Sequence, residues 1–233
     1  MGKVFFLFIS IICITACSSG EIGNSRDVNP ETIYISYSVF YREGDDNAEC
    51  LAQFRFAGED GTTLVLNAPS FVQFDGHEIT VDSNRFIGGA YYRINPDYKN
   101  FSGKHEWKYT DAAGKVYSQK FEFAPFSLAG EIKSSVSDNE NLEIKFNGIP
   151  DGDTVNCIAS DTSVNSADIN EDFLVNNGAI TISSPMLKKL APGPVNIIIS
   201  RNYSTGLLQS TPEGGEFRFD YELFPREIYL TKK

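Results

Sequence analysis

The sequence predicts an all-β protein built from two tandem β-sandwiches, and three observations lead to this fold class. Large apolar residues recur at every second position over many short segments, which is the period of a half-buried strand. Turn dipeptides that supply positive φ separate these segments, among them Asp75-Gly76, Asn147-Gly148 and Asn177-Gly178. The chain also repeats itself at an offset of about 90 residues, so the same fold is expected twice.

The first sixteen residues are expected to be a signal peptide. Lys3 gives a short positive start, an apolar run follows over residues 4–14, and Thr15 and Ala16 are small. The run is too short for a transmembrane helix, which needs roughly 20 apolar residues. These features predict a secretory signal over residues 1–16.

The end of this signal, Ile14-Thr15-Ala16-Cys17, resembles the lipobox of bacterial lipoproteins. The resemblance implies cleavage between Ala16 and Cys17, a diacylglycerol on the Cys17 thiol and an acyl chain such as palmitate on its new amino group. Because Ser18 is not Asp, it also implies an outer-membrane location in the cell envelope. A plain secretory signal or a short N-terminal anchor are the alternatives. Residues 17–31 begin with small polar side chains, and we expect them to form a lipidated flexible tether.

The first sandwich is expected over residues 32–124. Alternating large residues predict its strands, namely Ile33-Ile35-Tyr37-Val39, Ala52-Phe54-Phe56, His105-Trp107-Tyr109 and Tyr117-Gln119-Phe121-Phe123. Asn95-Pro96 offers an N-cap followed by proline, which predicts one short helical turn between two strands. Trp107 is expected in the core of this sandwich.

The second sandwich is expected over residues 125–233. Residues 142–148 match 52–58, residues 178–190 match 89–101, and Gly193 matches Gly103. Ser184-Pro185 repeats the helix signal. Phe217 and Phe219 match Phe121 and Phe123 at an offset of 96, so the last hairpin connection is expected to be six residues longer than in the first repeat.

About seven short strands per ~100 residues are typical of an immunoglobulin-like sandwich. Residues 103–123, with the turn Thr110-Asp111-Ala112-Ala113-Gly114-Lys115, resemble the final hairpin of bacterial extracellular immunoglobulin-like domains. Such domains serve as adhesins, spacers and accessory modules of enzymes, so the resemblance implies a fold more sharply than a ligand. The second repeat departs from this pattern, because Arg201 stands where the first has Asp111.

Composition and motifs exclude several classes of function. The formal net charge is −11, with 31 acidic against 20 basic residues, which argues against nucleic acid as a partner. His77-Glu78 and His105-Glu106 lack the second histidine of a zinc-protease motif. We therefore expect no catalytic residue, no metal and no cofactor, with Asp151-Gly152-Asp153 as the least improbable ion site.

Cysteine usage does not indicate a disulfide framework. Cys13 leaves with the signal and Cys17 is expected to be acylated, which leaves Cys50 and Cys157 in different repeats. We expect both to be buried, unpaired thiols.

Exposed aromatic and apolar side chains are the remaining functional signal. Tyr92 is expected on the outer face of its strand, while Tyr203, Leu207 and Leu208 are expected in or near the lengthened connection of the second repeat. The alternative is that Leu207-Leu208 extends the hairpin and packs against the neighbouring sandwich. The sequence thus predicts a non-catalytic envelope lipoprotein that binds a glycan or a protein, with a structural or accessory subunit of an envelope assembly as the alternative.

Overall fold

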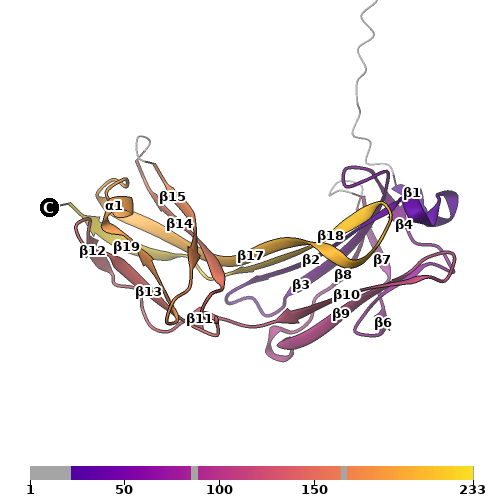
Figure 1. The fold of residues 1–233 in the computed structure, drawn as a ribbon, viewed down its shortest axis with the longest axis horizontal. Coiled ribbons are helices and arrows are strands. Elements are labelled where there is room, and N and C mark those ends of the chain that lie inside the picture. Colours follow the sequence, from indigo (N-terminus) through magenta and orange to yellow (C-terminus); the bar gives the residue numbers. More distant parts are fainter. Residues whose placement is uncertain (1–21, 85–88, 164–166, 233) are drawn as a thin grey trace, which may run out of the picture.

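The computed structural model describes residues 22–84, 89–163 and 167–232. The chain forms two β-sandwiches that lie end to end along the long axis of the molecule (Figure 1). The strand β1 (Ile22–Asn24) lies at one end and the C-terminus at the other. Strands make up most of the described chain, so the predicted all-β fold class is confirmed.

The N-terminal sandwich has two layers that face each other through aromatic side chains. The Tyr37 and Trp107 rings, from opposite layers, stack with their centroids 5.3 Å apart. One layer consists of β1, β2 (Ile33–Arg42), β3 (Glu49–Phe56), β4 (Thr62–Val65), β7 (Val81–Asn84) and β8 (Gly89–Ile94). The other has the order β10 (Val116–Phe123), β9 (Gly103–Thr110), β5 (Phe71–Phe74), β6 (His77–Glu78).

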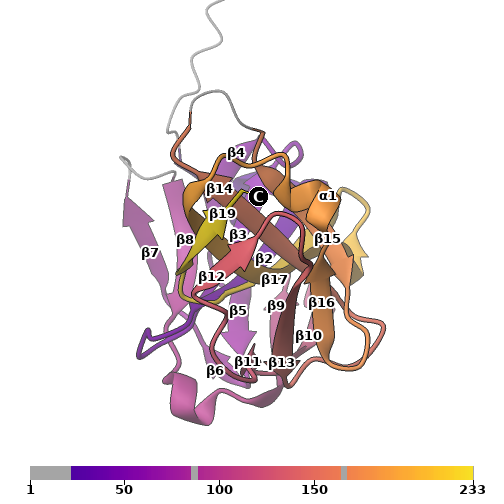
Figure 2. The same ribbon diagram turned by 90° about the vertical axis from the view of Figure 1, so that its left-hand side faces the viewer.

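The C-terminal sandwich repeats this plan. Its smaller layer has the order β11 (Ser127–Leu128), β13 (Leu142–Asn147), β16 (Ala179–Ile182). Its larger layer contains β12 (Ser135–Ser137), β14 (Thr154–Asp161), β15 (Ile169–Leu174), β17 (Gly193–Thr211) and β19 (Arg226–Thr231). Figure 2 views this sandwich end-on, with β13 and β16 to one side of β14 and β19.

The last hairpin crosses from the C-terminal to the N-terminal sandwich. Strand β17 has 19 residues; its first part pairs with β14 and β19, and its second part pairs with β18 (Gly214–Glu222). Strand β18 then pairs in parallel with β2 over eight residue pairs, from Gly215↔Ile35 to Glu222↔Arg42. We call residues 201–222 the crossing hairpin. Its pairing does not follow the boundary expected between residues 124 and 125, because these second-repeat residues belong to the N-terminal sandwich.

The crossing hairpin also changes which strands of the two repeats correspond. The rings of Phe217 and Phe121 lie 5.1 Å apart, so these two residues are packing partners across the core. The strand that takes the place of β10 in the C-terminal sandwich is β19, since Gly193 pairs with Leu230 as Gly103 pairs with Phe123. The expected match of Phe121 and Phe123 with Phe217 and Phe219 is therefore wrong. Both segments alternate large residues because both line the same core.

The repeated glycines that begin β9 and β17, and the β9–β10 turn, form as the sequence predicts. Gly103 and Gly193 have φ values of 122° and 125°, so the repeated glycine marks a repeated backbone conformation. In the β9–β10 turn, Asp111 is 3% exposed. Its Oδ1 accepts hydrogen bonds from the backbone N–H groups of Ala113 (2.8 Å) and Lys115 (2.9 Å). This buried carboxylate fixes the β9–β10 turn.

The two short helical turns form where expected, but their caps differ. The first, η3 (Tyr98–Asn100), begins after Asp97, whose side chain accepts from the Lys99 N–H, so Asn95 is not its N-cap. The second, α1 (Ser184–Leu187), has Ser183 at the N-cap, and the Ser184 hydroxyl donates to the Asp138 carbonyl instead of capping. In both cases a nearby residue takes the capping position.

Residues 22–31 of the tether expected over residues 17–31 are part of the fold. Ile22 already belongs to β1, which pairs in parallel with β4, and η1 (Ser25–Asp27) and η2 (Pro30–Thr32) follow. Asn67 donates its backbone N–H to the Ser25 hydroxyl at 2.9 Å, which ties η1 to the sandwich. Among the described residues, no helix has the length and apolar character to cross a bilayer.

Candidate binding surface

The residues expected in the lengthened connection lie in the crossing hairpin. Tyr203, Leu207 and Leu208 are part of β17. Tyr203 pairs with Phe219 of β18, and the two leucines lie in the irregular stretch between the paired residues Gly206 and Thr211. Their exposure differs: Tyr203 is 40% exposed, Leu208 is 68% exposed and Leu207 is partly buried. The structure thus brings the three together on one strand but gives each a different environment.

Tyr203 presents a fixed, half-exposed aromatic ring between the two sandwiches. Its ring stacks on Phe219 with centroids 5.1 Å apart and an interplanar angle of 17°. Two residues earlier, Arg201 forms an ion pair with Asp153 at 2.6 Å, which joins β17 to the turn before β14. Burial raises the pKa of the Tyr203 phenol, so the hydroxyl stays neutral and can donate a hydrogen bond. The site therefore combines an aromatic face with charged and hydrogen-bonding neighbours.

Leu207 and Leu208 dock the tip of the crossing hairpin on the N-terminal sandwich. Leu207 packs against the core. Its Cδ1 lies 2.6 Å from the position that a Cβ on Gly215 would take, but glycine is needed there because the Ile35 carbonyl oxygen would lie 2.3 Å from that Cβ. The Leu208 N–H donates to Gln119 Oε1 at 2.8 Å. Leu207 thus packs against the neighbouring sandwich, as the alternative expects, whereas the Leu208 side chain stays exposed and only its backbone N–H makes a contact.

Tyr92 is not part of an exposed surface. It is 3% exposed, its ring meets Phe54 edge-on, and its hydroxyl accepts from the Leu66 N–H at 2.6 Å. The pairing register of β8 on β3, Ala52↔Tyr92, places Tyr92 on the same face as the inward-pointing Ala52. The expectation of exposure is therefore wrong, because the face of a strand depends on its register.

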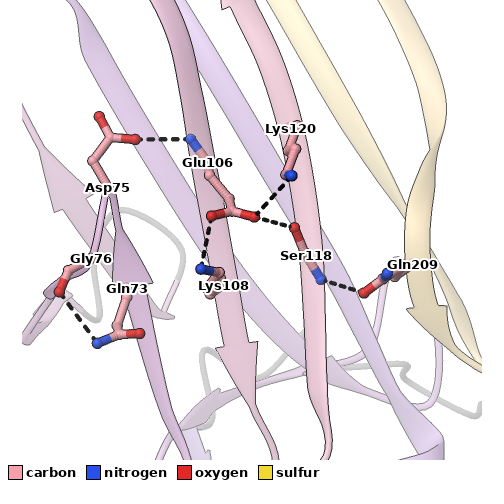
Figure 3. A network of polar contacts seen from close by, with 8 residues as sticks. All are labelled: Gln73, Asp75, Gly76, Glu106, Lys108, Ser118, Lys120 and Gln209. Carbon is pink, nitrogen blue, oxygen red and sulfur yellow. Dashed lines mark hydrogen bonds and ion pairs between the residues drawn. The ribbon is translucent and has the colours of Figure 1, made fainter.

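Where the crossing hairpin meets β10, glutamine side chains and not a backbone ladder join the two; Figure 3 shows the contact made by Gln209. The Ser118 N–H donates to Gln209 Oε1 at 2.9 Å, and the Ser118 hydroxyl donates to Glu106 Oε1 at 2.6 Å. Glu106 also forms ion pairs with Lys108 and Lys120, at 2.9 and 3.8 Å. The hydrogen bonds from Lys108 and Ser118 hold the pKa of the Glu106 carboxyl below its usual range. The sequence did not predict the roles of Gln119 and Gln209, since isolated polar residues in strands carry no local signal.

His105 is a structural residue of β9. Its Nδ1 lies 2.7 Å from Asp75 Oδ2 and its Nε2 lies 2.8 Å from the Phe101 carbonyl oxygen. Asp75 Oδ1 also accepts the Glu106 N–H at 2.8 Å. A shallow hollow of about 620 Å³ above these residues is lined by charged side chains of both signs. Of the carboxylates there, Asp75 and Glu106 are engaged by a backbone N–H group, a hydroxyl, lysines or His105.

The acidic turn Asp151-Gly152-Asp153 is used for structure. Asp151 Oδ1 accepts the Gly178 N–H at 2.8 Å, and Asp153 pairs with Arg201. Within the part of the chain that the structure describes, no group of three or more His, Cys, Asp or Glu residues is placed to hold a metal ion.

Cys50 and Cys157 are both free and buried, as expected. Burial raises the pKa of the Cys157 thiol to about 12 and that of Cys50 still further above its usual range. Cys17, the expected lipidation site, and Ala16, on the other side of the expected cleavage, lie outside the described residues.

No protein-family model and no curated protein matches the chain. Among solved structures, it is similar to the N-terminal Ig1–2 module of the Drosophila receptor protein tyrosine phosphatase DLAR. That match has 12% identity over 85% of this chain and 98% of the other, with a TM-score of 0.24. The fibronectin(III)-like modules of Clostridium thermocellum CbhA match with 10% identity over 85% and 94% of the two chains and a TM-score of 0.26.

A tetra-tandem repeat from the extending region of a large adhesion protein matches with 10% identity, 84% and 49% coverage and a TM-score of 0.26. With TM-scores this low, these likenesses carry no argument of their own. The strand order and the facing layers described above are what identify the chain as tandem immunoglobulin-like β-sandwiches.

Proposed function

We propose that this chain is a lipid-anchored protein of the cell envelope that acts as a non-catalytic binding or adhesion module for a glycan or a protein. The observation that carries the binding role is Tyr203. Its ring is 40% exposed yet held in one orientation by Phe219, beside the Arg201–Asp153 ion pair. A ring that is already ordered loses little side-chain entropy when a ligand stacks on it.

The chemistry of this surface suits a sugar ring or an aromatic or aliphatic side chain of a protein. The Tyr203 ring supplies an apolar face, while Arg201 and Asp153 supply a donor and an acceptor next to it.

Glycan-array and pull-down assays with the purified protein test this role. Tyr203→Ala is expected to lose binding, and Tyr203→Phe is expected to retain most of it because the apolar ring remains. Tyr229→Ala is the matched control, since Tyr229 is 56% exposed on β19. A Tyr203→Ala protein that binds as well as wild type would exclude this surface.

The membrane anchor is tested separately at Cys17. Metabolic labelling with a palmitate analogue is expected to mark the protein, and Cys17→Ser is expected to abolish both the label and fractionation with membranes. Membrane association that persists without label would instead mean an uncleaved N-terminal anchor.

A second candidate function is a structural or accessory subunit of an envelope assembly. The exposed edge strand β15 favours it, because β15 pairs only with β14 among the described strands and carries Leu174, which is 56% exposed. In that case Leu174→Lys would remove partner proteins from a co-purification, whereas Tyr203→Ala would keep them.

A further inference from the structure

The chain between the proposed lipid and the fold is short. Four residues, 18–21, separate Cys17 from Ile22, the first residue of β1. Even fully extended, this stretch spans at most about 18 Å between the two Cα atoms. Pairing of Ile22–Asn24 with Thr63–Val65 fixes β1 to the N-terminal sandwich. Lipid attached to Cys17 therefore lies close to the end of the molecule that carries β1.

Several other elements gather at this end of the molecule. The Glu213 N–H at the tip of the crossing hairpin donates to the Glu31 carbonyl at 3.2 Å, and Arg218 pairs with Glu59 at 2.8 Å. The opposite end of β17 lies with the C-terminus, where Gly193 pairs with Leu230 (Figure 1). At about 3.3 Å per residue, the 19 residues of β17 separate the two ends by about 60 Å.

We propose that the β1 end of the N-terminal sandwich rests on the lipid surface and that the C-terminal sandwich projects away from it. This inference rests on the proposed lipid anchor. The linker between Cys17 and Ile22 is less than a third as long as β17. It is therefore too short to let the C-terminal sandwich face the bilayer while the β1 end points away from it. The distal surface then consists of α1, the turn at residues 138–141 and the C-terminus.

The proximal end offers lipid both apolar contact and negative charge. Phe56 is 40% exposed at the end of β3, and with Ile22, Val28 and Leu64 it lines a hollow of about 270 Å³. Asp27 also lines the hollow, and exposed carboxylates outnumber exposed basic groups on the segments at this end, namely Asp27, Glu31, Glu59, Asp60 and Glu213 against Arg26 and Arg218, the latter paired with Glu59. Like charges repel, so we assign this surface to zwitterionic lipid headgroups.

Energy transfer from a single labelled thiol to acceptor lipids tests the orientation. The lipidated full-length protein is reconstituted in phosphatidylcholine vesicles containing a small fraction of rhodamine-labelled lipid. A fluorescent donor is placed on Glu213→Cys at the proximal end or on Lys188→Cys at the distal end, both exposed positions. Cys50 and Cys157 are buried and give little background, which the protein without an added cysteine measures. Glu59→Cys and Glu140→Cys form a second pair.

Transfer is expected to be strong at residues 213 and 59 and weaker, on the order of threefold or more, at residues 188 and 140. A ten-residue Gly/Ser insertion after Gly20 adds about 18 Å of root-mean-square reach and is expected to reduce transfer at residue 213. Equal or reversed transfer in protein that sediments with vesicles overturns the orientation while leaving the anchor intact. Failure of the wild type to sediment better than Cys17→Ser overturns the anchor itself.

Discussion

Replacement of Phe217 by alanine tests whether the crossing hairpin completes the N-terminal sandwich. Phe217 belongs to the second repeat by sequence, but it is 1% exposed, pairs with Tyr37 across the β18–β2 ladder and packs on Phe121. The cavity left by Phe217→Ala therefore opens inside the N-terminal sandwich.

Truncation of a buried phenylalanine to alanine costs about 3–5 kcal/mol of the free energy of unfolding. Single domains are stable by about 5–15 kcal/mol, so the loss is a large fraction of the total. With a urea m-value of about 2 kcal/mol/M, a loss of 4 kcal/mol lowers the midpoint by about 2 M.

Trp107 makes the assay specific. It is the only tryptophan in the chain, it is fully buried, and its ring stacks on Tyr37, so its emission reports unfolding of the N-terminal sandwich. Urea unfolding followed by this emission is expected to shift in Phe217→Ala. The control Phe224→Ala removes a ring that is 59% exposed and is expected to change stability by no more than about 0.5 kcal/mol.

The reasoning would be refuted if Phe217→Ala left the Trp107 transition where it is in wild type. Circular dichroism would in that case show a loss of stability confined to the other sandwich. Such a result would mean that the two repeats fold independently, each with its own last hairpin.

Three further predictions concern single side chains. Asp111→Ala leaves two backbone N–H groups of the β9–β10 turn without a charged acceptor. It is expected to lower the free energy of unfolding by about 3 kcal/mol, measured from the shift of the urea midpoint that Trp107 emission reports. Burial, followed by the charge of Glu222, raises the pKa of the Asp220 carboxyl; the ionised form is thus disfavoured in the fold. Asp220→Asn is therefore expected to raise the urea midpoint at pH 7, a gain that disappears below about pH 3.8. Cys50 and Cys157 are expected to react with a thiol reagent only after unfolding; fast reaction of the native protein would contradict their burial.

The pH dependence of the Glu106 network has the opposite sign to that of Asp220. Lys108 and Ser118 lower the pKa of Glu106, so its contribution to stability is present above the unfolded value of about 4.5. That contribution is lost as the pH falls through the folded value. Glu106→Gln is expected to flatten the acid side of the stability profile below about pH 4.5, as measured by the Trp107 midpoint.

Local patterns determined the strands and turns of this protein. The alternation in residues 33–39 predicted which side chains of β2 face the core, and all four are buried. Asp111 and the repeated glycines at 103 and 193 predicted the final turn and strand starts, because few residues fit those backbone conformations. The change of offset after Gly193 marked the region where the chain departs from a simple tandem arrangement, although the six-residue insertion it implied falls with the match of Phe121 to Phe217.

The tertiary structure alone decided which strands are neighbours. Alternation shows that β18 has an apolar face, but a strand with such a face fits the edge of either sandwich. Its pairing with β2 placed Phe217 and Phe219 in the N-terminal core, made Leu207 a packing residue and left Tyr203 half exposed between the sandwiches. The register of β8 likewise turned Tyr92 inward. Pairing and register depend on contacts between residues far apart in the chain, which a pattern along the sequence does not contain.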